Sequence, residues 1–162
     1  MKEEGNIRNN ERIEIITRDL DGNIIDREVL KNVITKLNLN LHRDAVAGTL
    51  VNLDDLELKY IGYGDGTAVA SENDVWLGNE LGVNARIAIT SSDATVDKKY
   101  STVFKIPSTD WIGTIEEVGW FGGNAATVAK NTGTLMARAL YHKVKTIFFS
   151  IQINRIDTFS EV

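Results

Sequence analysis

The sequence predicts a mainly β protein, an antiparallel β-sandwich that opens with a β-hairpin and contains one α-helix. The main observation is a series of short segments in which apolar and polar residues alternate, separated by Gly, Asn and Ser. Only one segment has helical periodicity, whereas a parallel α/β sheet needs a helix between successive strands. The chain has 162 residues, 43% of them hydrophobic, which is enough for one domain with one core.

The chain is expected to begin with a flexible arm followed by a hairpin. Residues 1–10 are rich in Asn, Glu and Lys, a composition typical of segments that do not pack by themselves. Residues 11–18 then alternate in character, and Asp21-Gly22 is a strong signal for a tight turn into a second strand. The single sandwich domain is therefore predicted to span residues 11–162.

The one predicted helix covers about residues 27–47. Apolar residues recur there at steps of three and four, which places them on one stripe of a helix with about 3.6 residues per turn. Asp26 can cap its first turn, and Gly48 can end it. The stripe consists of Val29, Leu30, Val33, Ile34, Leu37, Leu41 and Ala45.

The remaining elements are predicted to be strands. Alternating segments occur at residues 56–60, 83–89, 100–106 and 147–154. In the last of these the apolar residues Ile147, Phe149, Ile151 and Ile153 share one face, so a slip of one residue would expose the whole apolar set. The segment "GTIEEVGWFGG", residues 113–123, is read as a further strand that leads into an exposed hairpin loop at residues 122–133.

Composition excludes several classes of partner. The net charge of −5 disfavours nucleic acid, because affinity for phosphates depends on Lys and Arg. The absence of Cys excludes disulfides and thiol nucleophiles. The chain begins with a polar, acidic segment rather than a secretory signal, and no segment approaches the roughly 18 apolar residues of a membrane span. We therefore expect neither a nucleic-acid nor a membrane partner.

No cofactor or metal site is predicted. The segment "IGYGDGT" carries Gly62, Gly64 and Gly66, but it lacks the GxGxxG spacing and the Lys of a phosphate-binding loop. These glycines are better interpreted as a bend or bulge at the end of a strand. The two histidines, His42 and His142, lie far apart and have no partner at the spacing of metal ligands.

The adjacent carboxylates Glu116 and Glu117 lie beside large aromatic residues, as in a sugar-cleaving site. Successive residues of a strand point to opposite faces, so these two side chains cannot readily flank one glycosidic bond. We instead predict a buried structural Glu117 paired with Arg138, since their strands flank one hairpin loop. The face of the strand that carries Glu117 is expected to include Ile115, Gly119 and Phe121.

Four short boxes together resemble a family of tailed-bacteriophage virion proteins. The family comprises small tail, tail-fibre-attachment or head-appendage proteins, and the resemblance runs from about Asp21 to Asp157. A glycine segment, an L-G-x-E box, an E-[IV]-G-[LW]-F box and a G-T-L-x-A-R box occur in that order. They fall on Gly62, Gly64 and Gly66; on Leu77, Gly78 and Glu80; on Glu117, Gly119, Trp120 and Phe121; and on Gly133, Leu135, Ala137 and Arg138. The arginine that follows the L-G-x-E box here is Arg86.

The resemblance implies a non-enzymatic structural component of a phage virion, assembled in the host cytoplasm. The location that the resemblance favours is the tail, fibre or baseplate region. There the protein would form a homo-oligomer and dock other virion proteins. One alternative is a capsid decoration or head-fibre protein. An alternative of another class is a carbohydrate-binding module for a host-surface glycan, in which Trp76, Trp111 and Trp120 would stack on sugar rings.

Overall fold

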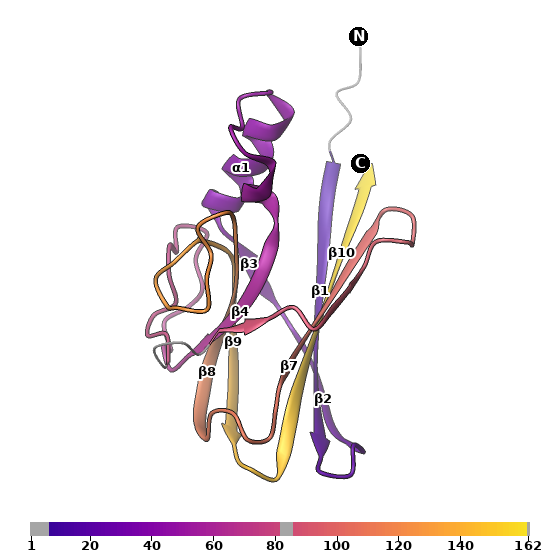
Figure 1. The fold of residues 1–162 in the computed structure, drawn as a ribbon, viewed down its shortest axis with the longest axis vertical. Helices are drawn as coiled ribbons and strands as arrows, with labels where there is room; N and C mark the ends of the chain where they lie inside the picture. The colour runs from indigo at the N-terminus through magenta and orange to yellow at the C-terminus, as the bar shows by residue number, and fades with distance from the viewer. Residues whose placement is uncertain (1–6, 82–85, 162) are drawn as a thin grey trace.

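The computed structural model describes residues 7–81 and 86–161, and it confirms the antiparallel β-sandwich. Sheet A contains β1 (Ile7–Asp19), β2 (Ile24–Leu30), β6 (Ser91–Asp93), β7 (Lys99–Ile106) and β10 (Phe149–Glu161). Sheet B contains β3 (Asn32–Ile34), β4 (Leu58–Gly64), β5 (Ile87–Ala88), β8 (Gly113–Gly122) and β9 (Thr134–Lys145). The strand orders are β2-β1-β10-β7-β6 and β3-β9-β8-β4-β5. Helix α1 (Lys36–Val46) and the 3₁₀ turn η1 (Leu53–Leu56) lie at one end of the sandwich (Figure 1).

The predicted hairpin is formed by β1 and β2. Gly22 occupies the turn with φ +87°, a left-handed conformation that glycine adopts without a steric penalty. β1 also pairs with β10 along its whole length, from Ile7 opposite Glu161 to Asp19 opposite Phe149. Residues 7–10 of the expected flexible arm therefore belong to a strand, and residues 1–6 lie outside the described part of the chain.

The prediction of a helix over residues 27–47 is wrong in its first half, which forms the end of β2 and the short strand β3. Asp26 does not cap a helix, because its carboxylate accepts a hydrogen bond from Lys143 of β9 at 2.5 Å. Helix α1 begins after Thr35, whose Oγ1 accepts the backbone N–H of Asn38 at 3.3 Å. Pairing with β1 and β9 thus overrides the local helical periodicity.

The end of α1 agrees with the prediction. Gly48 follows the helix with φ +69°, and its N–H donates to the carbonyl oxygen of Ala45 at 3.1 Å. No helix within residues 7–81 and 86–161 has the length and apolar character that a membrane crossing requires. Strand β5 (Ile87–Ala88) lies near the end of the strand predicted over residues 83–89. Residues 82–85 lie outside the described part of the chain.

The principal core fills the space between the two sheets. The predicted inward face of β10 is confirmed by Ile151 and Ile153, both 0% exposed, whereas Ile147 precedes the strand and is half exposed. Burial of each such side chain stabilises the fold by about 1.5 to 3 kcal/mol. The buried members of this core include Ile13, Ile15, Phe104, Ile106, Ile151 and Ile153 from sheet A, and Ile61, Val118, Trp120 and Tyr141 from sheet B.

The expected faces of β8 need one correction. The register between β8 and β9 shifts between Ile115 and Glu117, so strict alternation is broken at that point. Ile115 consequently packs in the principal core with Val118 and Trp120, and does not share a face with Phe121. Glu117 does share a face with Phe121, as expected, but this is the outer face of sheet B, which residues 65–81 cover.

The outer face of sheet B is covered by residues 65–81, which run beside β8 and β9 (Figure 1). Leu77 from this segment packs against Phe121 and Leu135 in a second apolar cluster. The approach is close at Gly119, where an added Cβ would lie 2.7 Å from Cδ2 of Leu77. The boxes of the sequence therefore supply one packed layer on this face.

Candidate functional site

The four sequence boxes meet at the carboxylate of Glu117. This side chain is 0% exposed and accepts backbone N–H groups from Gly66, Gly78 and Asn79, each at 3.0 Å. Arg138 donates from Nε at 2.7 Å, which confirms the predicted ion pair. Four donors thus surround one buried anion, and we call Glu117, Arg138 and their partners the Glu117 clamp.

Arg138 connects the clamp to the covering segment. Its Nη1 donates to Asp74 at 2.8 Å and its Nη2 to the carbonyl oxygen of Ala68 at 2.9 Å. Burial lowers the pKa of the guanidinium, but the hydrogen bonds to Asp74 and Glu117 outweigh this effect, so the pKa is raised. The clamp therefore fastens residues 65–81 to β8 and β9.

The glycine spacing is explained by close approach to Glu117. An added Cβ on Gly64 or Gly66 would lie 2.4 Å from Oε1 of Glu117, closer than carbon and oxygen can pack. The N–H of Gly66 points at a carboxylate of the protein itself. Glu117 thus occupies the position that the phosphate of a nucleotide would take in a phosphate-binding loop.

A second buried ion pair lies beside the clamp. Arg86 donates to both oxygens of Glu80, from Nε at 2.6 Å and from Nη2 at 3.0 Å. Its Nη1 donates to the carbonyl oxygen of Thr132 at 2.6 Å, and the guanidinium lies 3.5 Å from the ring centre of Phe121. This pair attaches the loop between β8 and β9 to the chain around Glu80.

Neither ion pair has the arrangement of a sugar-cleaving site. The carboxylates of Glu80 and Glu117 are buried and compensated by arginines, as in structural ion-pair networks. Glu116 lies at the register shift of β8, outside the clamp, and accepts from Nδ1 of the exposed His142 at 2.9 Å. His42 donates from Nδ1 to the carbonyl oxygen of its own helix. Within residues 7–81 and 86–161 no three His, Asp or Glu side chains are grouped to hold a metal ion.

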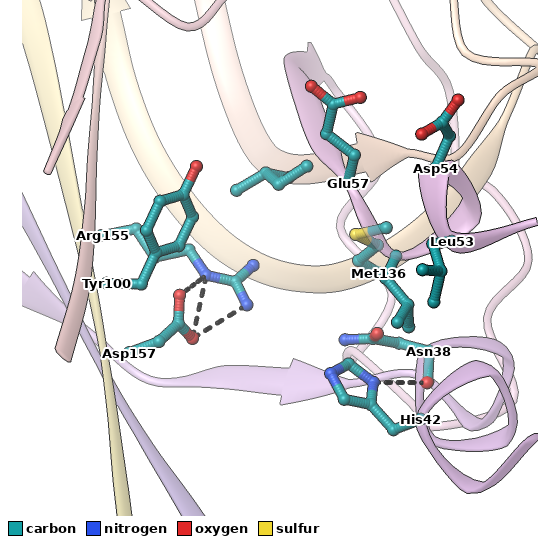
Figure 2. Close-up of a pocket in the computed structure, with 11 residues that line it drawn as sticks. Asn38, His42, Leu53, Asp54, Glu57, Tyr100, Met136, Arg155 and Asp157 are labelled. Carbon is teal, nitrogen blue, oxygen red and sulfur yellow. Dashed lines mark hydrogen bonds and ion pairs between the residues drawn. The ribbon is translucent and has the colours of Figure 1, made fainter. Parts of the chain in front are cut away.

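A cavity of about 420 Å³ lies where α1 and η1 meet the open end of the two sheets (Figure 2). None of its charged residues belongs to a motif considered above as a site. Arg155 and Asp157 continue the inward face of the strand that begins with Ile151 and Ile153. Two charged residues at inward positions of a strand are the pattern that could have indicated this site from the sequence. Its polar and charged lining consists of Asn38, His42, Asp54, Glu57, Tyr100, Arg155 and Asp157.

One wall of this cavity is a buried charge cluster. Arg155 donates to both oxygens of Asp157 and, from Nη2, to Glu11 of β1 at 2.5 Å. Its guanidinium also lies 5.7 Å from the ring centre of Trp120. Burial, and to a smaller extent the charge of Asp157, raises the pKa of the Glu11 carboxyl from 4.5 to about 7, although Arg155 acts in the opposite direction.

The change Glu11→Gln is expected to stabilise the protein above pH 7. A carboxyl group whose pKa is raised by folding contributes stability that is present below pH 4.5 and is lost as the pH rises through about 7. One pKa unit corresponds to about 1.4 kcal/mol, so the neutral amide gains up to about 3 kcal/mol at pH 8 and little at pH 4. Urea unfolding of both proteins across this range measures the difference. Parallel pH profiles would contradict the raised pKa.

The four boxes are separate in the sequence but converge on the Glu117 clamp in the structure. Gly66, Gly78 and Arg138 donate hydrogen bonds to Glu117, Gly64 packs against it, and Gly62 packs against Phe121 and Glu80. This convergence explains the spacing of the boxes by packing and hydrogen bonding. No family model, curated protein or solved structure matches the chain.

Proposed function

We propose that this chain is a non-enzymatic docking module of a tailed-bacteriophage virion, placed in the tail, fibre or baseplate region. It would work as a homo-oligomer or repeated subunit that contacts other virion proteins. The four boxes that resemble the virion family support the location. The observation that carries the docking role is an apolar surface at the end of the sandwich opposite α1.

Three neighbouring turns form this surface, which we call the apolar end. The β1–β2 turn lies next to the β9–β10 turn, because Asp19 pairs with Phe149, and the start of β8 is adjacent because Gly113 pairs with Lys145. Figure 1 shows the turns together at the end away from α1. Large exposed apolar patches commonly mark contact sites. Its members, 45% to 66% exposed, are Leu20, Ile24, Ile25, Ile112, Val144, Ile147 and Phe148.

The two buried ion pairs support a rigid module. They hold the segments 65–81 and 122–133 against sheet B, whose strands β8 and β9 also reach the apolar end. A preformed surface loses less conformational entropy on association than a flexible one. Glu80 and Glu117 are buried and paired with arginines, which is consistent with a structural role for these two carboxylates.

The alternative use of tryptophans as a sugar-stacking platform has less support. Trp120 is 0% exposed and belongs to the principal core. Trp111 packs against Tyr63, with 5.9 Å between ring centres. Of the three, Trp76 is the most exposed, at 38%. The side chains therefore do not form the shared exposed surface that this alternative requires.

The double change Ile147→Ser and Phe148→Ser is expected to abolish self-association or incorporation into particles while leaving the fold intact. Both side chains are at least half exposed, so their replacement removes apolar contact area from a partner but little from the core. Sedimentation velocity and particle composition measure the effect. The matched control is Val51→Ser, which is 99% exposed and lies far from the apolar end. Equal behaviour of the double variant and the control would contradict docking through this end.

The proposed location is tested by electron microscopy of particles labelled with an antibody to this chain. Label at the tail tip, fibre or baseplate is the expected result. Label on the capsid would favour a decoration or head-fibre role. Particles without label would exclude a virion component altogether.

A further inference from the structure

The cavity at the α1 end combines carbon surface with hydrogen-bonding groups. Leu53, Leu56, Leu58 and Met136 supply apolar lining, and Tyr100 adds an aromatic ring. Its volume of about 420 Å³ falls within the range of about 300 to 1,000 Å³ of small-molecule sites. The cavity lies apart from the Glu117 clamp and from the apolar end, so its role is independent of the proposed docking function.

Asn38 is the first polar group without an internal partner. Its residue is 4% exposed, and its Oδ1 is buried and makes no hydrogen bond within residues 7–81 and 86–161. A buried oxygen acceptor without a partner costs about 1 to 3 kcal/mol of stability. Since a half-turn about χ2 exchanges its two ends, Asn38 can present either a donor or an acceptor to the cavity.

Arg155 is the second such group and lies on the facing wall. Its Nε and Nη2 are bonded to Asp157 and Glu11, but Nη1 is buried and has no hydrogen bond within residues 7–81 and 86–161. Figure 2 shows the guanidinium of Arg155 and the amide of Asn38 extending toward one another from β10 and α1. Two unpartnered, nine-tenths buried groups thus face one cavity from opposite sides.

The charges around the cavity decide which ligands fit. Asp54 and Glu57 lie at its exposed side, and Glu11 and Asp157 lie behind Arg155, so carboxylates outnumber the guanidinium. An anion would meet this excess of negative charge. A cation that entered fully would meet Arg155. A neutral ligand with several hydroxyl groups avoids both penalties, because hydroxyls donate to carboxylates and to an amide oxygen while accepting from Nη1.

We propose that this cavity binds a neutral hexose unit, held between the amide of Asn38 and the guanidinium of Arg155. The ring carbons pack on the apolar lining and on Tyr100, and the hydroxyls reach Asp54 and Glu57. The site differs from the tryptophan platform considered above and shares no residue with it. A sugar site of this kind equips the protein to engage a glycan in addition to protein neighbours.

The experiment is a titration of the full, ¹⁵N-labelled chain followed by amide chemical shifts. The probes are methyl α-glucopyranoside, methyl β-galactopyranoside, methyl α-mannopyranoside and N-acetylglucosamine. Saturable shifts with at least one sugar, confined to α1, η1 and the adjoining ends of β7 and β10, are the expected result. The affinity should be insensitive to salt, because the ligand is uncharged.

Two variants and their controls locate the site. Asn38→Ala and Asp54→Ala should each weaken sugar binding about fivefold to tenfold, the loss of one hydrogen bond. Asp54 is exposed, so its variant tests the site even if Asn38→Ala does not fold. The controls are Asn40→Ala on the same helix and Asp97→Ala on a remote loop, both exposed, which should bind as the parent does.

Several results would overturn the proposal. These are the absence of saturable shifts with all four sugars, shifts centred on another surface, or unchanged affinity in Asp54→Ala. A cationic occupant is tested with Nα-acetyl-lysine methylamide. Saturable, salt-sensitive binding of this probe without binding of any sugar would assign the cavity to a lysine side chain of a protein partner instead.

Discussion

The single changes Glu117→Ala and Arg138→Ala should each lower the free energy of unfolding by about 3 to 5 kcal/mol, because each leaves the other charge buried without its partner. In Glu117→Ala the backbone N–H groups of Gly66, Gly78 and Asn79 also lose their acceptor. The double change should cost much less than the sum of the two. Urea unfolding of the four proteins measures the coupling.

The matched control for this cycle is Glu116→Ala. Glu116 is adjacent in sequence, but its side chain is outside the clamp and pairs with the exposed His142. An exposed pair of this kind contributes about 0 to 1 kcal/mol, so the control should unfold nearly as the parent does. A catalytic acid behaves differently, since its removal commonly leaves stability unchanged or improved. Small, additive losses of unfolding free energy in Glu117→Ala and Arg138→Ala would contradict a structural role for the clamp.

Arg86→Ala is expected to have an effect of similar size, about 3 to 5 kcal/mol, because Glu80 would remain buried and uncompensated. Arg86 also lies over the ring of Phe121 and bonds the carbonyl oxygen of Thr132, so its loss should increase backbone exchange in the loop between β8 and β9. Amide hydrogen exchange and urea unfolding measure the two effects.

Arg43→Ala provides the comparison for Arg86→Ala. Arg43 pairs with Asp44 at the surface, with 68% of its side chain exposed, and should therefore change the unfolding free energy by less than about 1 kcal/mol. A similar small loss in Arg86→Ala would mean that the Glu80–Arg86 pair is not formed in solution. Unchanged exchange at residues 122–133 would mean that this pair does not hold the loop.

Local patterns were sufficient for most of the strands. Alternation identifies Phe104 and Ile106 of β7 and Ile151 and Ile153 of β10 as inward, since a strand with one buried face has a period of two, although Ile147 falls outside the strand. The Glu117–Arg138 pair was also predictable, because two strands that flank one hairpin loop must lie side by side. The same reasoning places the loop at residues 122–133 at an exposed position.

The first half of the predicted helix shows why local patterns fail elsewhere. Apolar residues at 29, 30, 33 and 34 fit a helical stripe, but they also fit two short strands separated by Lys31. Thr35 decides where the helix begins, through its cap on Asn38 and its hydrogen bond to the carbonyl oxygen of Leu135. The second of these partners lies a hundred residues away, so periodicity within a window cannot register it.

The sequence alone determined the mainly β class, most of the strands, the hairpin and the principal buried ion pair, because these follow from short-range periodicity and from strands joined by a single turn. Tertiary structure decided the bulge that turns Ile115 into the core, the cluster of Glu11 with Arg155, and the cavity at the α1 end. Glu11 and Arg155 are brought together only by the pairing of the first strand with the last. Such contacts depend on how whole sheets align, and no local segment contains that information.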